Sequence, residues 1–369
     1  MPEIRVIGLR KQYGRVIALN GIDLTIHDGE YLSIVGPSGC GKTTLIKSIA
    51  GVVHPDEGDV LIGDTNVTSL PIEDRGVGYV FQEIALFPHM NVYDNVSYGL
   101  MIRGASPIER EGPVEEMLHM MNLEDYVTLY PKELSGGARQ KTAISRALTS
   151  GSTLLLLDEP LGALDLKVRT VLRYELRRLV KDLGLTAIHV THDQEEALSV
   201  SDRIVVMKAG RIVEVGPPKH LYMKPKELFT AKFLGEANFI SGEVIKMEGS
   251  ELTIEVNNLE LQAKCDLEPS LNAKEACVLA IRPEFIGIFR NPQKENAIRG
   301  EVVEASFIGD SMRYTIRTEN NLSLLVKMPI TGEEKILELG DEAYLSLPVE
   351  NLLVFKSPEE GLEKALSLE

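Results

Sequence analysis

The stretch GPSGCGKTT at residues 36–44 decides the fold of the first part of this chain. It fits the pattern G-x-x-x-x-G-K-[ST], in which Lys42 follows the second fixed glycine. The apolar run YLSIV at residues 31–35 predicts a buried strand before it, and TLIKSIAG at residues 44–51 has helical spacing after it. A strand, a glycine-rich turn and a helix are the setting in which this pattern surrounds a polyphosphate.

The residue types in this loop suit a nucleoside triphosphate. Glycines let backbone N–H groups approach phosphate oxygens without Cβ clashes, and the helix start adds partial positive charge. Lys42 reaches the outer phosphates, and the Thr43 hydroxyl is a ligand for Mg²⁺. The predicted nucleotide-binding residues of the loop are Gly36, Pro37, Ser38, Gly39, Cys40, Gly41, Lys42, Thr43 and Thr44. An ordinary glycine-rich turn is the alternative, but it does not require the strand and helix that flank this one.

The three cysteines are Cys40, Cys265 and Cys277, and their spacing suits neither a metal site nor a disulfide framework. This usage is typical of a reducing compartment. Cys40 lies inside the phosphate loop at a predicted helix start, where we expect a lowered thiol pKa and raised reactivity. The alternative is that Cys40 is only an inert small residue.

The composition describes an ordinary globular protein with room for two or three domains in 369 residues. The net charge is −16, and residues 241–369 hold 13 basic and 24 acidic residues. Because no basic stripe exists, nucleic acid is not an expected partner. The N-terminus lacks the apolar core of a signal peptide, and no 18-residue apolar window is present. We therefore predict a cytoplasmic chain that does not span a membrane by itself.

Polar residues follow three predicted strands, where the carboxyl ends of parallel strands would meet. The run STLLLLDEP ends in Asp158 and Glu159. Asp158 is placed to hold Mg²⁺ through water, and Glu159 to orient and deprotonate an attacking water. His192 closes the next buried strand, TAIHVTH, and Gln82 follows VGYVF. A surface turn and solvated strand ends are the alternatives, but a turn does not normally follow four leucines.

Two further segments indicate contacts with other chains. Ser135, Gly136 and Gly137 in LSGGARQ start an amphipathic helix and form a second anion-binding N-terminus, which we expect to cap the nucleotide of another subunit. A plain serine N-cap is the alternative. The loop from Glu83 to Val96 carries several apolar residues around a proline, which suggests a docking face for another protein.

Together these motifs resemble the ATPase subunits of ABC importers that carry an extra C-terminal domain, as in the maltose, spermidine, iron and oxyanion importers. In that resemblance GPSGCGKTT is the Walker A loop and LLLLDEP is Walker B. Gln82 belongs to the Q-loop, Leu134, Ser135, Gly136 and Gly137 form the signature motif, and Asp165 ends the D-loop ALD. His192 becomes the switch histidine.

The resemblance implies an α/β P-loop NTPase (ABC ATPase) domain over residues 1–235, with a helical subdomain at about 84–150. An all-β OB-like region, called TOBE, follows over residues 236–369. The implied activity is ATP hydrolysis that drives transport, with ATP and Mg²⁺ as cofactors. The implied catalytic residues are Glu159, His192 and Gln82, and the implied metal-binding residues are Thr43, Gln82 and Asp158. Tyr13, which on its own is more typical of a core residue, becomes the adenine-stacking residue.

The implied assembly is a homodimer on the cytoplasmic face of the membrane. Integral membrane permease subunits dock near Glu83–Val96, and an extracytoplasmic substrate-binding protein acts indirectly. Two departures from the usual signature are Ala138, where the family has Gln, and Lys141, where it has Arg. We expect Ala138 to remove a polar contact from the partner-side nucleotide face, with a tuning effect on activity.

The C-terminal region contains an internal duplication. FISGEVIKMEGSELTIEV at 239–256 parallels IRGEVVEASFIGDSMRYTI at 298–316, and VLAIRPEFIGIF at 278–289 parallels YLSLPVENLLVF at 344–355. Short alternating strands with glycine turns predict small barrels. Regulation, dimer support and ligand sensing all remain possible roles for this region.

The cargo follows only from resemblance. FLGEANFISGEV is more similar to the iron, oxyanion and polyamine importers than to the sugar importers. A metal or an inorganic oxyanion is therefore the first expectation, then a polyamine, then a sugar. The alternative function is a soluble mechanical ABC-type ATPase without a transporter, which predicts basic surfaces or two cassettes in one chain. A P-loop kinase or GTPase leaves LSGG and His192 unexplained.

Overall fold

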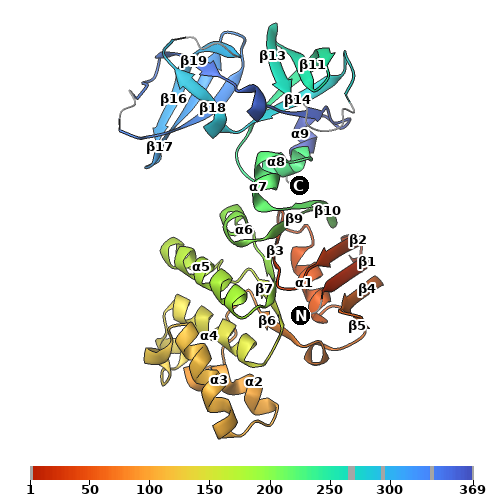
Figure 1. The fold of residues 1–369 in the computed structure, drawn as a ribbon, viewed down its shortest axis with the longest axis vertical. Coiled ribbons are helices and arrows are strands. Elements are labelled where there is room, and N and C mark those ends of the chain that lie inside the picture. Colours follow the sequence, from red (N-terminus) through yellow and green to blue (C-terminus); the bar gives the residue numbers. More distant parts are fainter. Residues whose placement is uncertain (1–2, 265–270, 292–295, 333–335, 368–369) are drawn as a thin grey trace. The chain divides into compact units, whose positions relative to one another are not determined.

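The structure of the chain is a computed structural model that describes residues 3–264, 271–291, 296–332 and 336–367. Cys265 lies outside the described residues. The chain forms two compact units, Met1–Pro218 and Lys219–Glu369, which we call unit 1 and unit 2 (Figure 1).

The boundary between the units falls earlier than the predicted one after residue 235. The reason lies in two short helices, α7 (Pro218–Met223) and α8 (Leu228–Phe233), which fall within the predicted ATPase domain of residues 1–235. Ala231 of α8 packs in an apolar cluster with residues of unit 2, and its carbonyl accepts a hydrogen bond from Arg282.

A six-stranded sheet forms the centre of unit 1, with strand order β10-β9-β3-β8-β7-β6. Its strands are β3 (Tyr31–Val35), β6 (Val77–Val80), β7 (Leu154–Asp158), β8 (Thr186–Val190), β9 (Arg203–Lys208) and β10 (Arg211–Gly216). All neighbouring strands are parallel except the edge pair β9–β10. Strands β3, β7 and β8 are buried along their whole length, as expected for a sheet that is covered on both faces.

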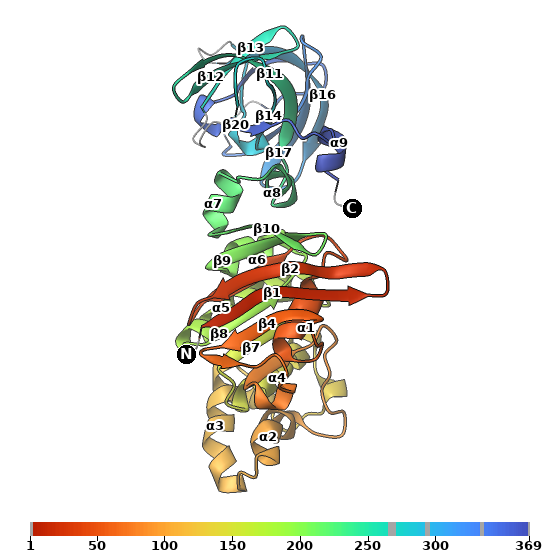
Figure 2. The ribbon, with the colours of Figure 1, turned by 90° about the vertical axis from the view of Figure 1, so that its right-hand side faces the viewer.

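The leucines of β7 show how the two faces are filled. Leu154 and Leu156 point into one apolar cluster, and Leu155 and Leu157 into another. The first cluster includes α1 (Lys42–Ala50) and an antiparallel sheet of order β2-β1-β4-β5 (Figure 2). The strands of this sheet are β1 (Ile4–Tyr13), β2 (Val16–Ile26), β4 (Glu57–Ile62) and β5 (Thr65–Asn66). The strand-rich start predicted from alternation is thus confirmed.

The second cluster joins the sheet to helices. Three of them, α2 (Val92–Ile102), α3 (Pro107–Met120) and α4 (Gly136–Thr149), lie between β6 and β7 in the chain, with no strand over residues 81–153. They form the expected helical subdomain. The face is completed by α5 (Leu166–Asp182), and α6 (Gln194–Val200) follows β8. Among the residues that the structure describes, we find no helix long and apolar enough to cross a bilayer.

Unit 2 is built from two five-stranded antiparallel sheets that share one apolar core. One sheet has the order β13-β12-β11-β14-β20, and the other β18-β17-β16-β19-β15. The strands of the first are β11 (Asn238–Glu248), β12 (Glu251–Val256), β13 (Leu259–Lys264), β14 (Ala276–Ile281) and β20 (Leu353–Lys356). Those of the second are β15 (Gly287–Phe289), β16 (Ala297–Phe307), β17 (Ser311–Thr318), β18 (Ser323–Pro329) and β19 (Glu342–Ser346). A short helix, α9 (Leu362–Ala365), follows.

The two sheets repeat the same four-strand order and then exchange their fifth strands. β15 follows β14 in the chain but pairs with β19, whereas β20 follows β19 but pairs with β14. Gly242 and Gly300 occupy matching places, since a Cβ on either would lie 2.7 Å from the Cγ2 of Ile254 or Ile316 on the neighbouring strand. The duplication predicted from the sequence is therefore present in the fold.

Candidate functional site

The phosphate loop connects β3 to α1 and lines a cavity of about 230 Å³. The lining residues are Ala18, Ser38, Gly39, Gly41, Lys42, Thr43, Thr44 and Glu159. Gly41 has a φ of 107° and caps α1, and a Cβ there would lie 2.2 Å from the carbonyl oxygen of Ala18. Only glycine fits this approach of the loop to β2.

Lys42 is almost fully buried and folds back on its own loop. Its ammonium group donates to the carbonyl oxygens of Gly36 at 2.8 Å and Pro37 at 3.0 Å. These two carbonyl oxygens hold the ammonium group of Lys42 at the N-terminus of α1. An outer phosphate of a nucleotide would replace them as its partner there.

The expectation for Cys40 was wrong. Its side chain is buried, with 3% exposed, and burial raises the pKa of the thiol, because the nearby charge of Lys42 offsets only part of the desolvation. The loss of hydration outweighs the favourable field of the helix N-terminus. Cys40 is therefore a small packing residue in this structure, in agreement with the alternative interpretation.

Thr43 and Asp158, two of the predicted metal-binding residues, lie in direct contact. The Thr43 hydroxyl donates to Asp158 Oδ1 at 3.2 Å, and Tyr79 on β6 donates its hydroxyl to Oδ2 at 3.0 Å. Burial and the neighbouring Asp158 carboxylate both raise the pKa of Tyr79, so its hydroxyl stays protonated and remains a donor. The side-chain amide of Gln82, the third predicted metal ligand, donates to Glu159 instead.

The three predicted catalytic residues meet at one oxygen atom. Glu159 Oε2 accepts a hydrogen bond from the Gln82 amide at 3.1 Å and lies 3.2 Å from Nδ1 of His192. The Glu159 side chain is 19% exposed and His192 58% exposed, so the carboxylate is sheltered while the imidazole faces solvent. The parallel strands β7 and β8 thus bring their polar ends together, as the sequence indicated.

The backbone at Glu159 is unusual for a residue with a side chain. Its φ is 48°, in the left-handed region that disfavours most L-residues. Its N–H donates to the carbonyl oxygen of Val190 at the end of β8, at 2.9 Å. This bond fixes the turn that directs the carboxylate toward the phosphate loop.

Other predicted residues lie apart from this cluster. Tyr13 is 49% exposed near the end of β1, with the Lys11 ammonium 5.5 Å from its ring centroid, and it does not line the phosphate-loop cavity. Ser135 caps α4 by accepting from the Ala138 N–H at 3.2 Å, and Asp165 caps α5 in the same way. The signature motif therefore has an ordered helix start, and none of its residues lines the phosphate-loop cavity of its own chain.

The two departures in the signature region occupy packed positions. Ala138 is 7% exposed and packs in the apolar cluster of the helical subdomain, but it also lines a surface cavity together with Ser135 and Lys141. Its expected effect at a partner-side face stays a prediction. Lys141 donates to the Met121 carbonyl oxygen at 3.1 Å and pairs with Glu175 of α5 at 2.8 Å.

The proposed docking loop is ordered by Asn95. Its side-chain amide accepts from the Phe87 N–H at 2.9 Å and donates to the Met90 carbonyl oxygen at 3.0 Å. Phe87 packs against Tyr98, with ring centroids 4.4 Å apart. Val92 and Val96 belong to the core, whereas Ile84, Leu86 and Met90 remain partly exposed.

A buried polar network beneath the strand ends was not predicted from the sequence. His189 is fully buried, its Nδ1 lies 3.1 Å from the Tyr31 hydroxyl, and burial lowers its pKa to about 3. Glu196, also buried, accepts from the Thr191 hydroxyl at 2.6 Å. A histidine and a glutamate in a strand–helix segment are common as solvated residues, so no sequence signal marked these two.

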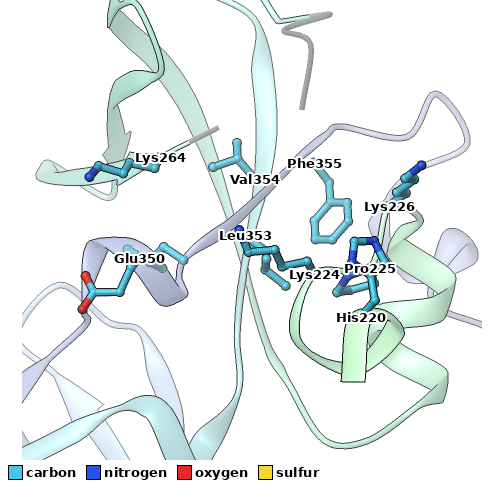
Figure 3. A pocket seen from close by; sticks show the side chains of 10 residues that line it. His220, Lys224, Pro225, Lys226, Lys264, Glu350, Leu353, Val354 and Phe355 are labelled. Carbon is cyan, nitrogen blue, oxygen red and sulfur yellow. The ribbon is translucent and has the colours of Figure 1, made fainter. Parts of the chain in front are cut away.

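Unit 2 contains a separate pocket of about 440 Å³ (Figure 3). Its floor is apolar, with Leu353, Val354 and Phe355 of β20. The polar residues around it are His220, Lys224, Lys226, Lys264 and Glu350. Because basic residues predominate, the lining does not suit a polycation or a metal cation.

Comparison with known proteins agrees with this geometry. Residues 19–162 match the ABC transporter family, and residues 279–355 match the TOBE domain. The chain is 44% identical to the spermidine/putrescine import ATP-binding protein PotA of Marinobacter nauticus over 86% of this chain and 85% of the relative. It is also 44% identical to the Fe(3+) ions import ATP-binding protein FbpC 1 of Rhizobium meliloti, over 84% and 86%.

A comparison with solved structures gives the same result for part of the chain. A dimeric structure of the ATP-binding cassette MJ0796 bound to ADP and Pi is 33% identical, with a TM-score of 0.53 over 58% of this chain and 98% of that chain. The fold and the site therefore define an ABC-type ATPase. The chain belongs to the ABC transporter family, among its import ATP-binding subunits with a C-terminal TOBE domain.

Proposed function

We propose that the chain binds ATP and Mg²⁺ at the phosphate loop and hydrolyses ATP with Glu159 as the general base. The observation that carries this proposal is the meeting of Gln82 and His192 on one oxygen of Glu159, beside the phosphate-loop cavity. In this arrangement Glu159 orients and deprotonates the attacking water, and His192 responds to the outer phosphate. The Tyr13 ring stacks on the adenine.

The residues around Asp158 fit a bound magnesium ion. The hydroxyl of Thr43 and the carboxylate of Asp158 are hard oxygen donors of the kind that Mg²⁺ prefers, and they lie 3.2 Å apart. When bound, Mg²⁺ neutralises charge on the phosphate oxygens. Gln82 joins this set if its amide turns from Glu159 toward the metal.

The working form in this proposal is a homodimer. The capped α4 helix of one chain, with Ser135 at its start, covers the nucleotide in the phosphate loop of the other chain. Two considerations support it: no residue of the signature motif lines the phosphate-loop cavity of its own chain, and the solved relatives are described as dimeric. Closure of the dimer moves the loop Glu83–Val96 and the permease subunits docked on it, at the cytoplasmic face of the membrane.

Mixing two inactive variants tests the shared sites. Lys42→Ala removes the lysine from the phosphate loop, and Ser135→Arg blocks the helix that serves the partner. Each variant alone has no complete site, but a mixed dimer has one, so mixing is expected to restore hydrolysis. Wild-type specific activity is also expected to rise with protein concentration. Failure of mixing to restore activity, in chains shown to be dimeric, contradicts the shared-site arrangement.

The cargo is proposed to be a small, multiply charged cation, either a polyamine or ferric iron. The two relatives named for these cargos are equally similar to this chain at 44% identity, so polyamine stands beside the metal instead of below it. An extracytoplasmic binding protein delivers the cargo to the permease. The basic lining of the unit 2 pocket argues against direct sensing of such a cation there.

Uptake by cells that lack this gene separates the two cargos. We would compare deletion strains that carry the wild-type gene or Glu159→Gln, using radiolabelled spermidine, ferric iron and molybdate. Loss of spermidine uptake alone identifies a polyamine importer, and loss of iron uptake alone identifies a metal importer. Loss of molybdate uptake alone, or no loss of any, contradicts a cationic cargo.

A further inference from the structure

Arg169, in the first turns of α5, connects the turn after Glu159 to the segment that carries His192. The D-loop precedes α5, and Asp165 caps the helix by accepting from the Val168 N–H at 3.1 Å. The guanidinium of Arg169 turns back over this cap. Its Nη2 donates to the carbonyl oxygens of Leu164 at 2.9 Å and Gly162 at 3.3 Å.

This turn is continuous with the proposed general base. The Gly162 N–H donates to the carbonyl oxygen of Glu159 at 3.3 Å. Arg169 therefore holds the far end of a short turn that begins at the residue with the left-handed φ. A shift of the guanidinium would be transmitted to Glu159 through two hydrogen bonds.

The other side of the guanidinium faces α6, which lies beside α5 (Figure 1). Nη1 lies 3.4 Å from Oδ2 of Asp193, the residue after His192, and Nε lies 3.9 Å from Oε1 of Glu196. Asp193 also caps α6, since its Oδ1 accepts from the N–H groups of Glu195 and Glu196. The same carboxylate thus fixes α6 and pairs with Arg169.

The switch segment is held from its other end as well. The Thr191 hydroxyl donates to Glu196 Oε2 at 2.6 Å and accepts from the Asp193 N–H at 3.0 Å. His192 stands between these two anchored residues, with its own side chain 58% exposed. The backbone around the imidazole is thus fixed while the ring itself faces solvent.

The surroundings favour arginine at this position. The side chains of Arg169 and Asp193 are each 22% exposed, and that of Glu196 is 3% exposed, so the charges are screened less than surface charges. A planar guanidinium can contact two carbonyls and a carboxylate at the same time, which a lysine ammonium cannot do in one position.

We propose that Arg169 is a positioning residue for ATP hydrolysis, which couples the D-loop turn at residues 162–165 to the switch segment at residues 191–193. Through it Glu159 and His192 move together when a nucleotide or a partner chain displaces either segment. The proposal rests on the roles proposed above for these two residues. Arg169 does not touch the reacting atoms and acts only through the two segments.

The test uses the full-length chain and three variants. Arg169→Met removes the charge, and Arg169→Lys keeps the charge but not the planar guanidinium. Asp193→Asn keeps a good helix cap while weakening the ion pair. The matched control is Arg178→Met on the same helix, whose 83% exposed side chain pairs with exposed Asp182. We would measure kcat, KM for ATP, equilibrium binding of a fluorescent ATP analogue and the melting temperature.

Arg169→Met is expected to lower kcat by about 10-fold to 10²-fold, since misplacing catalytic groups costs this much. KM and analogue binding should change by less than about 3-fold, because the phosphate loop is untouched. Arg169→Lys should retain intermediate activity and the control should match wild type. The double variant Arg169→Met/Asp193→Asn should be little worse than Arg169→Met alone, because both remove the same connection.

Two results would overturn the coupling. One is an unchanged kcat in Arg169→Met and Asp193→Asn. The other is a loss of kcat that is additive in the double variant and is accompanied by equal losses of nucleotide binding and melting temperature. That result would indicate a merely structural role for Arg169. Glu159→Gln is measured in parallel. If that variant still turns over, the proposed function fails, whereas if it is inactive and Arg169→Met is normal, only the coupling fails.

Discussion

Unit 1 and unit 2 use strands in different ways. The parallel strands β7 and β8 of unit 1 end at the same edge, and polar residues that follow them meet there, with Glu159 Oε2 3.2 Å from His192 Nδ1. The sheets of unit 2 are antiparallel and exchange their fifth strands. Buried polar side chains in unit 2, such as Asn238 and Arg282, bond to main-chain carbonyl groups. Buried polar groups hold the backbone in unit 1 as well, as Arg75 does with the carbonyl oxygens of Ser48 and Ile49, but the parallel strand ends of unit 1 also assemble a candidate reaction site.

The prediction with the largest expected effect is the loss of hydrolysis in Glu159→Gln. If hydrolysis is not lost, the comparison between the two units fails. Glu159→Gln should keep ATP binding but lower hydrolysis by about 10²-fold or more, since it removes the proposed general base. ATP then stays intact, so the variant should accumulate as an ATP-bound dimer. Steady-state turnover and size-exclusion chromatography with ATP measure both properties. The control is Glu350→Gln beside the unit 2 pocket, and an equal loss there would contradict the division of roles between the units.

The second prediction concerns a polar residue that holds unit 2 together. Asn238 on β11 reaches β18 of the other sheet, where its side chain donates to the Leu325 carbonyl oxygen at 2.8 Å and accepts from the Leu325 N–H at 2.7 Å. Asn238→Ala leaves these groups without their partner, which should cost about 1–3 kcal/mol of unfolding free energy. Denaturant unfolding measures the cost, and kcat per folded chain should stay unchanged. A lowered kcat with normal stability would show that unit 2 takes part in the chemistry.

The sequence predicted best those features that depend on a local pattern. The phosphate loop, the buried β7 and the helix start at Ser135 each depend on a few adjacent residues, and all are present. The duplication in unit 2 was also visible, because two segments repeat the same alternation. The exchange of β15 and β20 was not visible, because pairing partners far apart in the chain leave no periodic signal.

Other features depended on burial, which the sequence alone did not give. The pKa of Cys40 was expected to fall at a helix start, but the buried surroundings raise it. The contacts of Tyr79 and Arg169 join residues that are distant in the chain, so neither residue stood out from a motif. The short helices α7 and α8 were assigned to the wrong unit, because only the packing of Ala231 shows which core they join.

The third prediction concerns the response to acid. Burial lowers the pKa of His189 in unit 1 to about 3, whereas an unfolded histidine titrates near 6.5. Below about pH 6.5 the unfolded chain therefore binds a proton that the folded chain does not, and stability falls as the pH decreases. The slope of stability against pH approaches about 1.4 kcal/mol per pH unit between the two pKa values, that is, well below about 6.5 and above about 3.

The variant that tests this prediction is His189→Gln, because a glutamine side chain keeps hydrogen-bonding groups but does not titrate. Burial also raises the pKa of neighbouring Glu196, which favours the folded state on acidification and opposes the histidine. Because Glu196 is present in both proteins, the difference between wild type and variant, measured by urea unfolding from pH 7.5 to 5, reports on the histidine. Equal pH slopes in the two proteins would contradict a buried neutral His189.

The smallest effect sharpens the comparison, because it concerns a residue that supports the site without reaching the nucleotide. Tyr79→Phe removes the hydroxyl that donates to Asp158 Oδ2 and keeps the ring packed against Phe81. One lost hydrogen bond of this kind is worth about 0.5–1.5 kcal/mol, or roughly 2-fold to 10-fold in the Mg²⁺ concentration needed for half-maximal nucleotide binding and hydrolysis. A Mg²⁺ titration of fluorescent ATP-analogue binding reads the effect without turnover.

The matched control is Tyr344→Phe on β19 of unit 2, which should leave the Mg²⁺ dependence unchanged. Because Asp158 keeps its bond from Thr43, hydrolysis at saturating Mg²⁺ should stay close to wild type. A lower maximal rate with an unchanged Mg²⁺ midpoint would show that Tyr79 acts on the reacting groups and not through Asp158.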